Sequence, residues 1–229
     1  DSICSFECVY CQLGKINRVT TGRDIFVSTE KILSDLKNSD WQNADVITFS
    51  GSGEPTLAKN LGEIIEKIKE LTGKPIVVLT NSTLLHLEEV RKELLHSDKI
   101  FCKLDAWSND TLKRFDRPEK TVSLENIISG IKALQCKFKG FLAIQTMILR
   151  LPNESEIKQF AVILQLIKPD EVQLNLPTRP IPPEYFLATR GNEVEDNQSF
   201  THLKTISKNE LEKVRDKLSK LTKLPIIIR

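Results

Sequence analysis

Three closely spaced cysteines are the groups in this sequence best suited to chemistry. Cys4, Cys8 and Cys11 form a C-x3-C-x2-C loop near the start of the chain. Cysteine thiolates bind iron–sulfur clusters, and a four-iron cube normally takes one thiolate per iron. Three ligands with no fourth nearby leave one iron with an open position, and an open metal position is where chemistry takes place. The loop therefore predicts a reactive cluster.

Two other uses of these cysteines, a zinc site and a disulfide framework, agree less well with the sequence. Cys102 and Cys136 lie far downstream, in a predicted strand and a predicted helix, so neither is expected as a fourth ligand. A zinc site needs four Cys or His ligands, and His86, His96 and His202 are all remote from the loop. A disulfide framework is typical of short secreted chains, whereas this chain has 229 residues and an odd number of cysteines, five. The cluster is the favoured interpretation.

A glycine-rich turn is the second feature with chemical potential. It has the sequence Ser50-Gly-Ser-Gly-Glu-Pro-Thr56 and directly follows a predicted strand. Glycines let a backbone approach a ligand closely, the Glu54 carboxylate can accept from an ammonium group, and Pro55 suits a first helical turn. Alone, such a turn is equally suited to a phosphate. Because this turn lies one strand–helix unit after the cysteine loop, the two motifs together are a specific signal.

Alternating strand and helix patterns must position these groups. The predicted strands cover 44–50, 75–80, 99–105, 141–149 and 171–176, with helical patterns between them. This alternation predicts an α/β fold with a parallel sheet, but periodicity alone does not separate a partial barrel from an open doubly wound sheet. Asn153 with Glu156 predicts a capping box at the start of a helix that ends near Ile167. After Pro177 comes a proline-rich loop, and Ser207 with Glu210 predicts a capped amphipathic helix at the end of the chain.

Polar residues follow several strands, at the end where parallel α/β barrels place their active sites. Each group also has a structural alternative: small residues as turn or cap residues, a Lys–Asp pair as a buried ion pair, and amides as internal hydrogen-bond partners. The groups are Thr80, Asn81 and Ser82 after the second strand, Lys103 and Asp105 at the third, Gln145 in the fourth, and Gln173 and Asn175 in the fifth.

The composition excludes few functions. The chain is 40% hydrophobic and 28% charged with a net charge of +2, which is ordinary for a globular protein and neither requires nor excludes a nucleic acid. It contains no apolar run that would span a bilayer and does not open on a signal-peptide pattern. Because a cluster needs reduced thiols, we expect a cytoplasmic location and no membrane partner.

These motifs resemble those of the radical S-adenosylmethionine (radical SAM) superfamily. The resemblance runs from Cys4 to about Thr178. Within the superfamily, the chain is similar to an uncharacterised subgroup related to the wyosine-type tRNA tricyclic-base synthases. Those synthases place Trp-Arg after the last cysteine and carry further cysteines upstream, whereas Gln12 follows here. The motifs that carry the resemblance to this subgroup are Cys-Ser-Phe-x-Cys-Val-Tyr-Cys-Gln-Leu-Gly at 4–14, the segment 48–56, Leu79-Thr-Asn81 and Val172-Gln-Leu-Asn175.

The resemblance implies a fold and an activity. The expected fold is a partial (β/α)6 TIM-type barrel over 1–177, with its first strand preceding this sequence and with 178–229 as a loop-and-helix extension packed on the core. The expected enzyme binds a [4Fe–4S] cluster through Cys4, Cys8 and Cys11 and chelates SAM at the open iron. An external electron donor such as flavodoxin or ferredoxin would allow reductive cleavage of SAM to a 5′-deoxyadenosyl radical.

The resemblance also implies a set of SAM contacts. Tyr10 would lie against the adenine, Glu54 with the backbone of Ser52 and Gly53 would bind the methionine end, and polar strand ends would meet the carboxylate or ribose. No catalytic side chain is assigned beyond the cluster, because the cofactor carries the radical chemistry. The expected cofactor-binding residues are Tyr10, Ser52, Gly53, Glu54, Thr80, Asn81, Ser82, Asp105, Gln145 and Asn175.

Three functions stay open at this point. An enzyme acting on a small molecule or a peptide predicts a compact barrel mouth covered by the 177–190 loop, which carries Arg179, Tyr185 and Arg190. A tRNA-modifying enzyme predicts basic residues around that mouth and a salt-sensitive affinity for RNA. A non-enzymatic cluster- or metal-binding module would take its fourth ligand from a preceding segment or from a partner.

Overall fold

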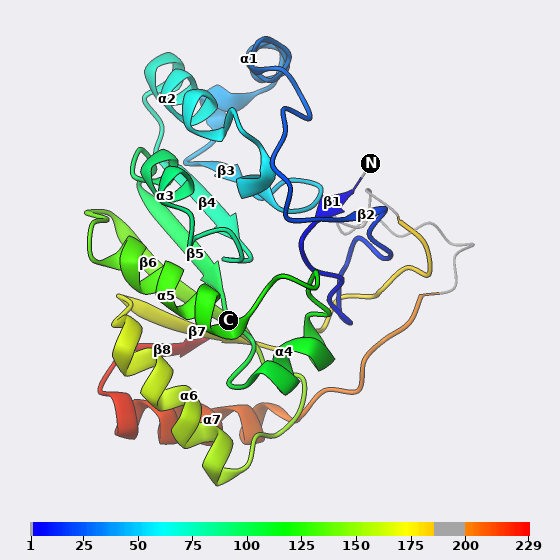
Figure 1. The fold of residues 1–229 in the computed structure, drawn as a ribbon, viewed down its shortest axis with the longest axis vertical. Coiled ribbons are helices and arrows are strands. Elements are labelled where there is room, and N and C mark those ends of the chain that lie inside the picture. Colours follow the sequence, from blue (N-terminus) through cyan, green and yellow to red (C-terminus); the bar gives the residue numbers. More distant parts are fainter. Residues whose placement is uncertain (1, 186–199) are drawn as a thin grey trace.

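Six parallel strands form the main sheet of this chain (Figure 1). The computed structural model describes residues 2–185 and 200–229. The strands follow one another in space as they do in the sequence, from β3 to β8. A doubly wound sheet reverses its strand order at a switch point, so this order is that of a barrel-type fold. The strands are β3 (Ile47–Phe49), β4 (Ile76–Thr80), β5 (Lys99–Lys103), β6 (Phe141–Met147), β7 (Glu171–Asn175) and β8 (Ile226–Ile228).

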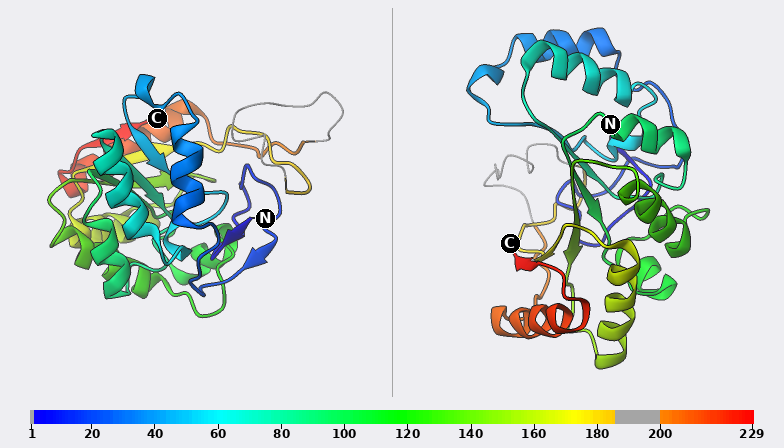
Figure 2. Two further views of the ribbon diagram at one scale, coloured as in Figure 1. Left: turned by 90° about the horizontal axis from the view of Figure 1, so that it is seen from above. Right: turned by 90° about the vertical axis from the view of Figure 1, so that its left-hand side faces the viewer.

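Helices cover one face of this curved sheet, and the N-terminal segment lies at the carboxyl ends of its strands (Figures 1 and 2). Within the described residues β3 and β8 are not paired with each other, so the barrel is open. The helices are α1 (Thr29–Lys37), α2 (Leu61–Thr72), α3 (Glu88–Leu94), α4 (Asn109–Phe115), α5 (Leu124–Gln135), α6 (Glu154–Ile167) and α7 (Lys208–Thr222), with 3-10 turns at Trp41–Asn43 and Pro55–Leu57.

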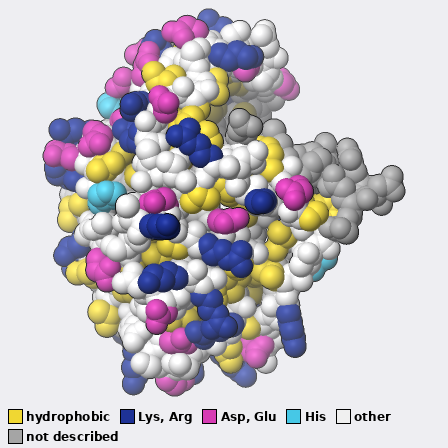
Figure 3. Space-filling model, turned by 45° about the vertical axis from the view of Figure 1, so that its right-hand side comes forward, with side chains coloured by type: hydrophobic (Ala, Val, Ile, Leu, Met, Phe, Trp, Pro, Cys, Tyr) yellow, Lys and Arg dark blue, Asp and Glu magenta, His cyan; other side chains and the backbone are white. Residues whose placement is uncertain are grey.

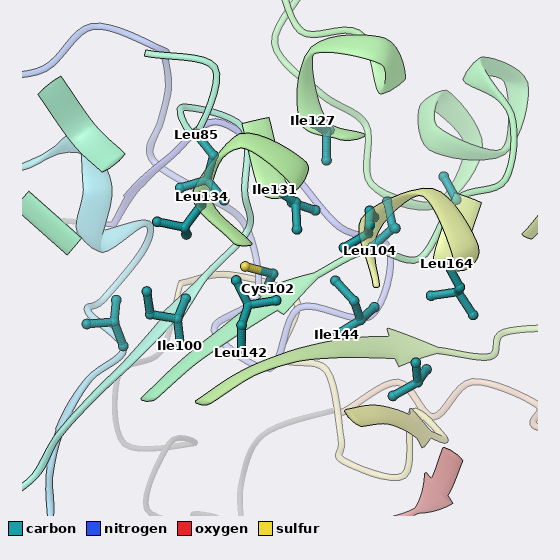
Figure 4. Close-up of a cluster of buried hydrophobic side chains, with 14 of the residues drawn as sticks. Leu85, Ile100, Cys102, Leu104, Ile127, Ile131, Leu134, Leu142, Ile144 and Leu164 are labelled. Atoms are coloured by element: carbon teal, nitrogen blue, oxygen red, sulfur yellow. The ribbon is translucent and has the colours of Figure 1, made fainter. Parts of the chain in front are cut away.

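The hydrophobic core lies between the sheet and its helices (Figure 4). Ile100, Leu142 and Ile144, on neighbouring strands, are fully buried, as is Ile131 on α5. Cys102 lies in the same layer, and burial raises the pKa of its thiol to about 12. It is therefore a protonated core residue and not a fourth ligand.

A separate two-stranded parallel ribbon frames the cysteine loop. It pairs β1 (Ile3–Cys4) with β2 (Arg18–Val19), so the loop leaves and rejoins the same small ribbon. The first ligand candidate, Cys4, is the last residue of β1. The described chain thus begins beside the site.

The predicted alternation is confirmed, and one strand was not anticipated. All five predicted strands are present, and both predicted capping boxes form, Asn153 with Glu156 on α6 and Ser207 with Glu210 on α7. β8 was missed, although it pairs with β7 and so adds a strand from beyond residue 177 to the main sheet. The boundary at 177 and a strand preceding this sequence stay predictions. In the described part of the chain no helix is long and apolar enough to cross a membrane.

Candidate functional site

The cysteine loop is held at the carboxyl ends of the strands by the segment that follows α4. Glu7 N donates to the carbonyl of Asp116 at 3.0 Å, and Val9 N donates to that of Phe115 at 2.9 Å. In the other direction, Glu119 N donates to Ser5 O at 2.9 Å. The stretch around Cys8 is therefore shaped by residues more than 100 positions later in the chain.

The three thiols of the loop fit an iron–sulfur cluster by the chemistry of their donor set. Burial raises the pKa of Cys4 to about 12, with Glu54 and Cys11 adding to the effect. Burial also raises the pKa of Cys8 and of Cys11. Three soft ligands whose ionised forms repel one another need a positive centre to become thiolates together.

A single metal ion fits the arrangement less well than a cluster does. Across the described ranges, no three His, Cys, Asp or Glu side chains converge as they would on one metal ion. A cluster bonds each thiolate to a different iron and does not require such convergence.

Hydrogen bonds already reach two of the sulfurs. Cys4 Sγ accepts from Phe6 N and from Asn81 Nδ2, both at 3.4 Å. Cys8 Sγ–H donates to Asp116 Oδ1 at 3.7 Å. Donors to a cluster sulfur stabilise added negative charge there, so the two bonds to Cys4 would bear on the potential of a bound cluster as well as on loop shape.

The glycine turn packs directly on the cysteine loop. A Cβ at Gly53 would lie 1.8 Å from the carbonyl oxygen of Ile3, so only glycine fits. The next residue completes the contact, since Glu54 N donates to Ile3 O at 3.0 Å. Gly51 has φ +59°, a left-handed conformation that glycine adopts without strain. The two sequence motifs therefore form one site.

Glu54 is buried beneath this contact and bound by the chain itself. Its Oε1 accepts from Thr56 N at 3.0 Å, Thr56 Oγ1 at 2.7 Å and Thr80 Oγ1 at 2.6 Å, and Oε2 accepts from Asn81 N at 2.6 Å. Burial raises the pKa of Glu54, although each of these bonds acts to lower it. The carboxylate thus joins the ends of β3 and β4, and its contact with SAM stays a prediction.

The polar turn after β4 supports the cysteine loop. Asn81 Nδ2 donates to Ser5 Oγ at 2.8 Å, and Ser5 Oγ lies 2.6 Å from Thr83 Oγ1. Ser82 has φ +71°, and its N–H donates to Thr80 Oγ1 at 3.1 Å. These contacts agree with the alternative in which the small polar residues serve the turn. Thr83 belongs to the predicted polar turn 80–83, whereas Ser5 was missed because a small hydroxyl residue carries no distinctive spacing.

The predicted Lys103–Asp105 pair is confirmed, and it belongs to a larger network. Lys103 Nζ lies 2.9 Å from Asp105 Oδ2 and also pairs with Asp116. Tyr10 OH donates to Asp105, whose other oxygen accepts from Met147 N at 2.8 Å. Asp116 was not anticipated, since its local sequence is that of an exposed helix end.

The strand amides satisfy one another in part. Gln145 Nε2 donates to Gln173 Oε1 at 2.9 Å, and Gln173 Nε2 donates to Glu171 Oε1 at 2.7 Å. In this structure the two glutamines therefore serve as internal hydrogen-bond partners, which is the structural alternative predicted for them. Ligand contacts of Gln145 and Asn175 stay predictions.

The late proline-rich segment meets the far end of the cysteine loop. Arg179 donates to Gln12 Oε1, and a Cβ at Gly14 would lie 2.2 Å from Glu184 O. A hollow of about 440 Å³ opens beside this contact. Arg190 lies outside the described residues. The hollow is lined by Lys15, Ile16, Asn17, Glu184 and Tyr185.

Comparisons with known sequences place these motifs in a family. Residues 2–164 match the model of the radical SAM superfamily. UPF0026 protein slr1464 of Synechocystis sp. is 46% identical over 228 residues, which cover 98% of this chain and 86% of that protein. A Brachyspira hyodysenteriae protein named GTPase Obg is 34% identical over 224 residues, 96% of this chain but 33% of the longer protein.

Solved structures show the same fold. Streptococcus suis SuiB bound to its precursor peptide SuiA has a TM-score of 0.69 and 14% identity, and SuiB bound to S-adenosylmethionine has a TM-score of 0.63 and 12% identity. The likeness covers 100% of this chain but only 47% and 46% of SuiB, so this chain spans less than half of that protein. Because the family match takes in the cysteine loop, the glycine turn and the strands that join them, this chain belongs to the radical SAM superfamily, whose members use S-adenosylmethionine and an iron–sulfur cluster.

Proposed function

We propose that this protein is an enzyme that binds a [4Fe–4S] cluster through Cys4, Cys8 and Cys11 and cleaves SAM reductively. The observation that carries the proposal is the contact between the two motifs, where Gly53 lies against Ile3 and Glu54 donates its N–H to the same residue. When bound, the cluster supplies one electron, which splits SAM into methionine and a 5′-deoxyadenosyl radical.

The residues of the chain hold and orient the cofactors. Glu54 Oε2 accepts one hydrogen bond from a described residue, whereas Oε1 accepts three, so Oε2 has room for an ammonium donor. Phe6 is 2% exposed and excludes water from one side of the loop. Tyr10, placed by its bond to Asp105, offers a ring for adenine to stack on.

Anaerobic reconstitution tests the proposal. The protein is loaded with iron and sulfide, reduced with dithionite in the presence of SAM, and assayed for 5′-deoxyadenosine. We expect about four irons and four sulfides per chain, and product formation that disappears in Cys8→Ser. Cys136→Ser is the matched control, because Cys136 is exposed at the end of α5, and it should behave as the wild type.

One outcome would favour the non-enzymatic module. A protein that assembles the cluster but neither binds nor cleaves SAM would overturn the enzymatic proposal. Where the wild type does cleave SAM, Glu54→Gln, which keeps the size of the side chain and removes its charge, separates SAM binding from cluster assembly. We expect it to weaken SAM binding, measured by calorimetry, while the iron content stays near that of the wild type.

For the substrate, we propose a small molecule or a peptide rather than tRNA. Over the face shown in Figure 3, Lys and Arg side chains intermingle with Asp and Glu, whereas a tRNA site predicts a basic patch. Titration of labelled tRNA at 50 and 200 mM salt decides between them, since phosphate contacts would give an affinity that falls steeply with salt.

Flavodoxin or ferredoxin is the proposed electron donor and the cytoplasm the proposed location.

A further inference from the structure

Lys103 places a positive charge directly against the cysteine loop. Its ammonium lies 4.7 Å from the ring centroid of Phe6 and 5.5 Å from that of Tyr10. Phe6 lies between the first two cysteines in the sequence, and Tyr10 between the second and third. The ammonium is therefore held beside the stretch of chain that carries Cys8.

Two buried carboxylates fix this ammonium in place. The side chains of Asp105 and Asp116 are each 1% exposed, and that of Lys103 is 20% exposed. Burial acts to lower the pKa of Lys103, but Asp105 and Asp116, followed by Cys8 and Tyr10, together hold it well above its ordinary value. Asp105 is itself anchored by Met147 N at 2.8 Å. Lys103 thus stays charged and has little freedom to move.

Charges of both signs act on the Cys8 sulfur. Asp116 Oδ1, which pairs with Lys103, also accepts from Cys8 Sγ–H at 3.7 Å. Lys103 and Asp116 therefore place one charge of each sign beside this stretch of the loop. Water screens such interactions weakly at buried positions, so each charge keeps much of its effect there.

The second oxygen of Asp116 has no described partner. Asp116 Oδ2 is buried and receives no hydrogen bond from residues 2–185 or 200–229. A buried carboxylate normally has its acceptor sites filled, so Asp116 is held here mainly through Oδ1, which pairs with Lys103. The carboxylate is therefore an electrostatic counterweight to Lys103.

We infer that the Lys103–Asp116 pair sets the reduction potential of the cluster bound by this loop. The inference rests on the proposed function in assuming the cluster. Reduction adds one electron, so a nearby cation stabilises the reduced state and raises the potential, whereas a nearby carboxylate lowers it. Lys103 and Asp116 are positioning charges in this role and need not touch SAM or substrate.

Opposite shifts in two variants test the inference. Reconstituted proteins without SAM are titrated potentiometrically at pH 8 and followed by electron paramagnetic resonance. Asp116 pairs with Lys103 in the folded chain, and the Asp116→Asn variant removes this carboxylate charge. At the wild-type midpoint, we expect Lys103→Met to lower the ratio of reduced to oxidised cluster about tenfold, a shift of about −59 mV for one electron. Asp116→Asn should raise that ratio.

Two further variants separate charge from structure. Lys103→Arg keeps the charge and should hold the midpoint ratio within about threefold of wild type. Lys99→Met is the matched control, since Lys99 lies at the opposite end of the same strand, exposed, with its ammonium 6.0 Å from the Phe141 ring. It should leave the potential unchanged.

The possible outcomes are distinguishable. Intact clusters with unshifted potentials, or shifts of the same sign in Lys103→Met and Asp116→Asn, would overturn the inference and leave the proposed function standing. If Lys103→Met fails to hold a cluster, Asp116→Asn decides by the sign of its shift, and Lys103→Arg decides if both neutral variants fail. A wild-type protein that assembles no cluster overturns the proposed function together with the inference.

Discussion

Single residues at this site fulfil structural and chemical roles together. Glu54 was singled out as a ligand for SAM, yet in the structure its carboxylate joins two strand ends. Asn81 donates to the sulfur of Cys4 and to the hydroxyl of Ser5. Substitutions at such positions change the fold and the cofactor site together, so each needs a readout of both.

Gly53→Ala should damage the contact between the motifs. The added Cβ would meet the Ile3 carbonyl at 1.8 Å, and backbone cannot move aside as a side chain can. We expect a loss of about 1–3 kcal/mol of stability in chemical denaturation, together with loss of bound iron. In Gly22→Ala the nearest atom is the Thr20 hydroxyl at 3.3 Å, and this control should change neither quantity. Equal behaviour of the two variants would contradict the packing argument.

Asn81→Ala should make the cluster easier to remove. It deletes the donors to Cys4 Sγ and Ser5 Oγ and leaves the hydroxyl and sulfur less well bound. We expect a destabilisation of about 1–3 kcal/mol and iron release to a chelator that is several-fold faster. Asn43→Ala, at an exposed residue whose side chain bonds to Asp40, is the control. Unchanged release would show that the bond to Cys4 is unimportant for retention.

At the scale of elements, local signals were predictable and distant partners were not. The capping box of Asn153 with Glu156 was predicted correctly, because both residues lie within one helical turn. β8 was missed because three isoleucines before the chain end become a strand only when β7 pairs with them. Asp116 was missed for the same reason: its significance comes from Lys103 and Cys8, distant in the sequence.

The start of α6 makes stability depend on pH. The hydrogen bond from Arg150 lowers the pKa of Glu156 from 4.5 to about 2. A depressed folded-state pKa contributes stability above the unfolded value of 4.5 and loses it as the pH falls through the folded value. Glu156→Gln should therefore cost about 1–2 kcal/mol at pH 7, after allowance for solvent screening.

Denaturation of the apo-protein at two pH values checks this expectation. The stability difference between wild type and Glu156→Gln should shrink between pH 7 and pH 3.5. Glu154→Gln is the control in the same helical turn, because Glu154 pairs with Lys217 across exposed surface, and it should show a much smaller difference. A difference that stays constant with pH would mean that the Arg150 pair does not lower the Glu156 pKa.

At the scale of the whole molecule, the chain end completes the sheet. Ile226 on β8 is 8% exposed, lies opposite Val172, and follows α7, which packs against α6. Ile226→Ala should lower the free energy of unfolding by about 2 kcal/mol in urea denaturation. Val162→Ala, at a residue that is 63% exposed on α6, should have little effect. If β8 contributed nothing to stability, the two variants would instead have equal free energies of unfolding.

The dependence of the cysteine loop on residues 115–119 also has a consequence for the order of synthesis. Ribosomes add about 5–20 residues per second, so the three thiols leave the ribosome several seconds before the segment that shapes their loop. During that interval the loop lacks the backbone hydrogen bonds that residues 115–119 supply, so Cys4, Cys8 and Cys11 are not yet held in their folded arrangement. We therefore expect delivery of the proposed cluster to wait for the middle of the chain, and translation speed to set how long the thiols need protection.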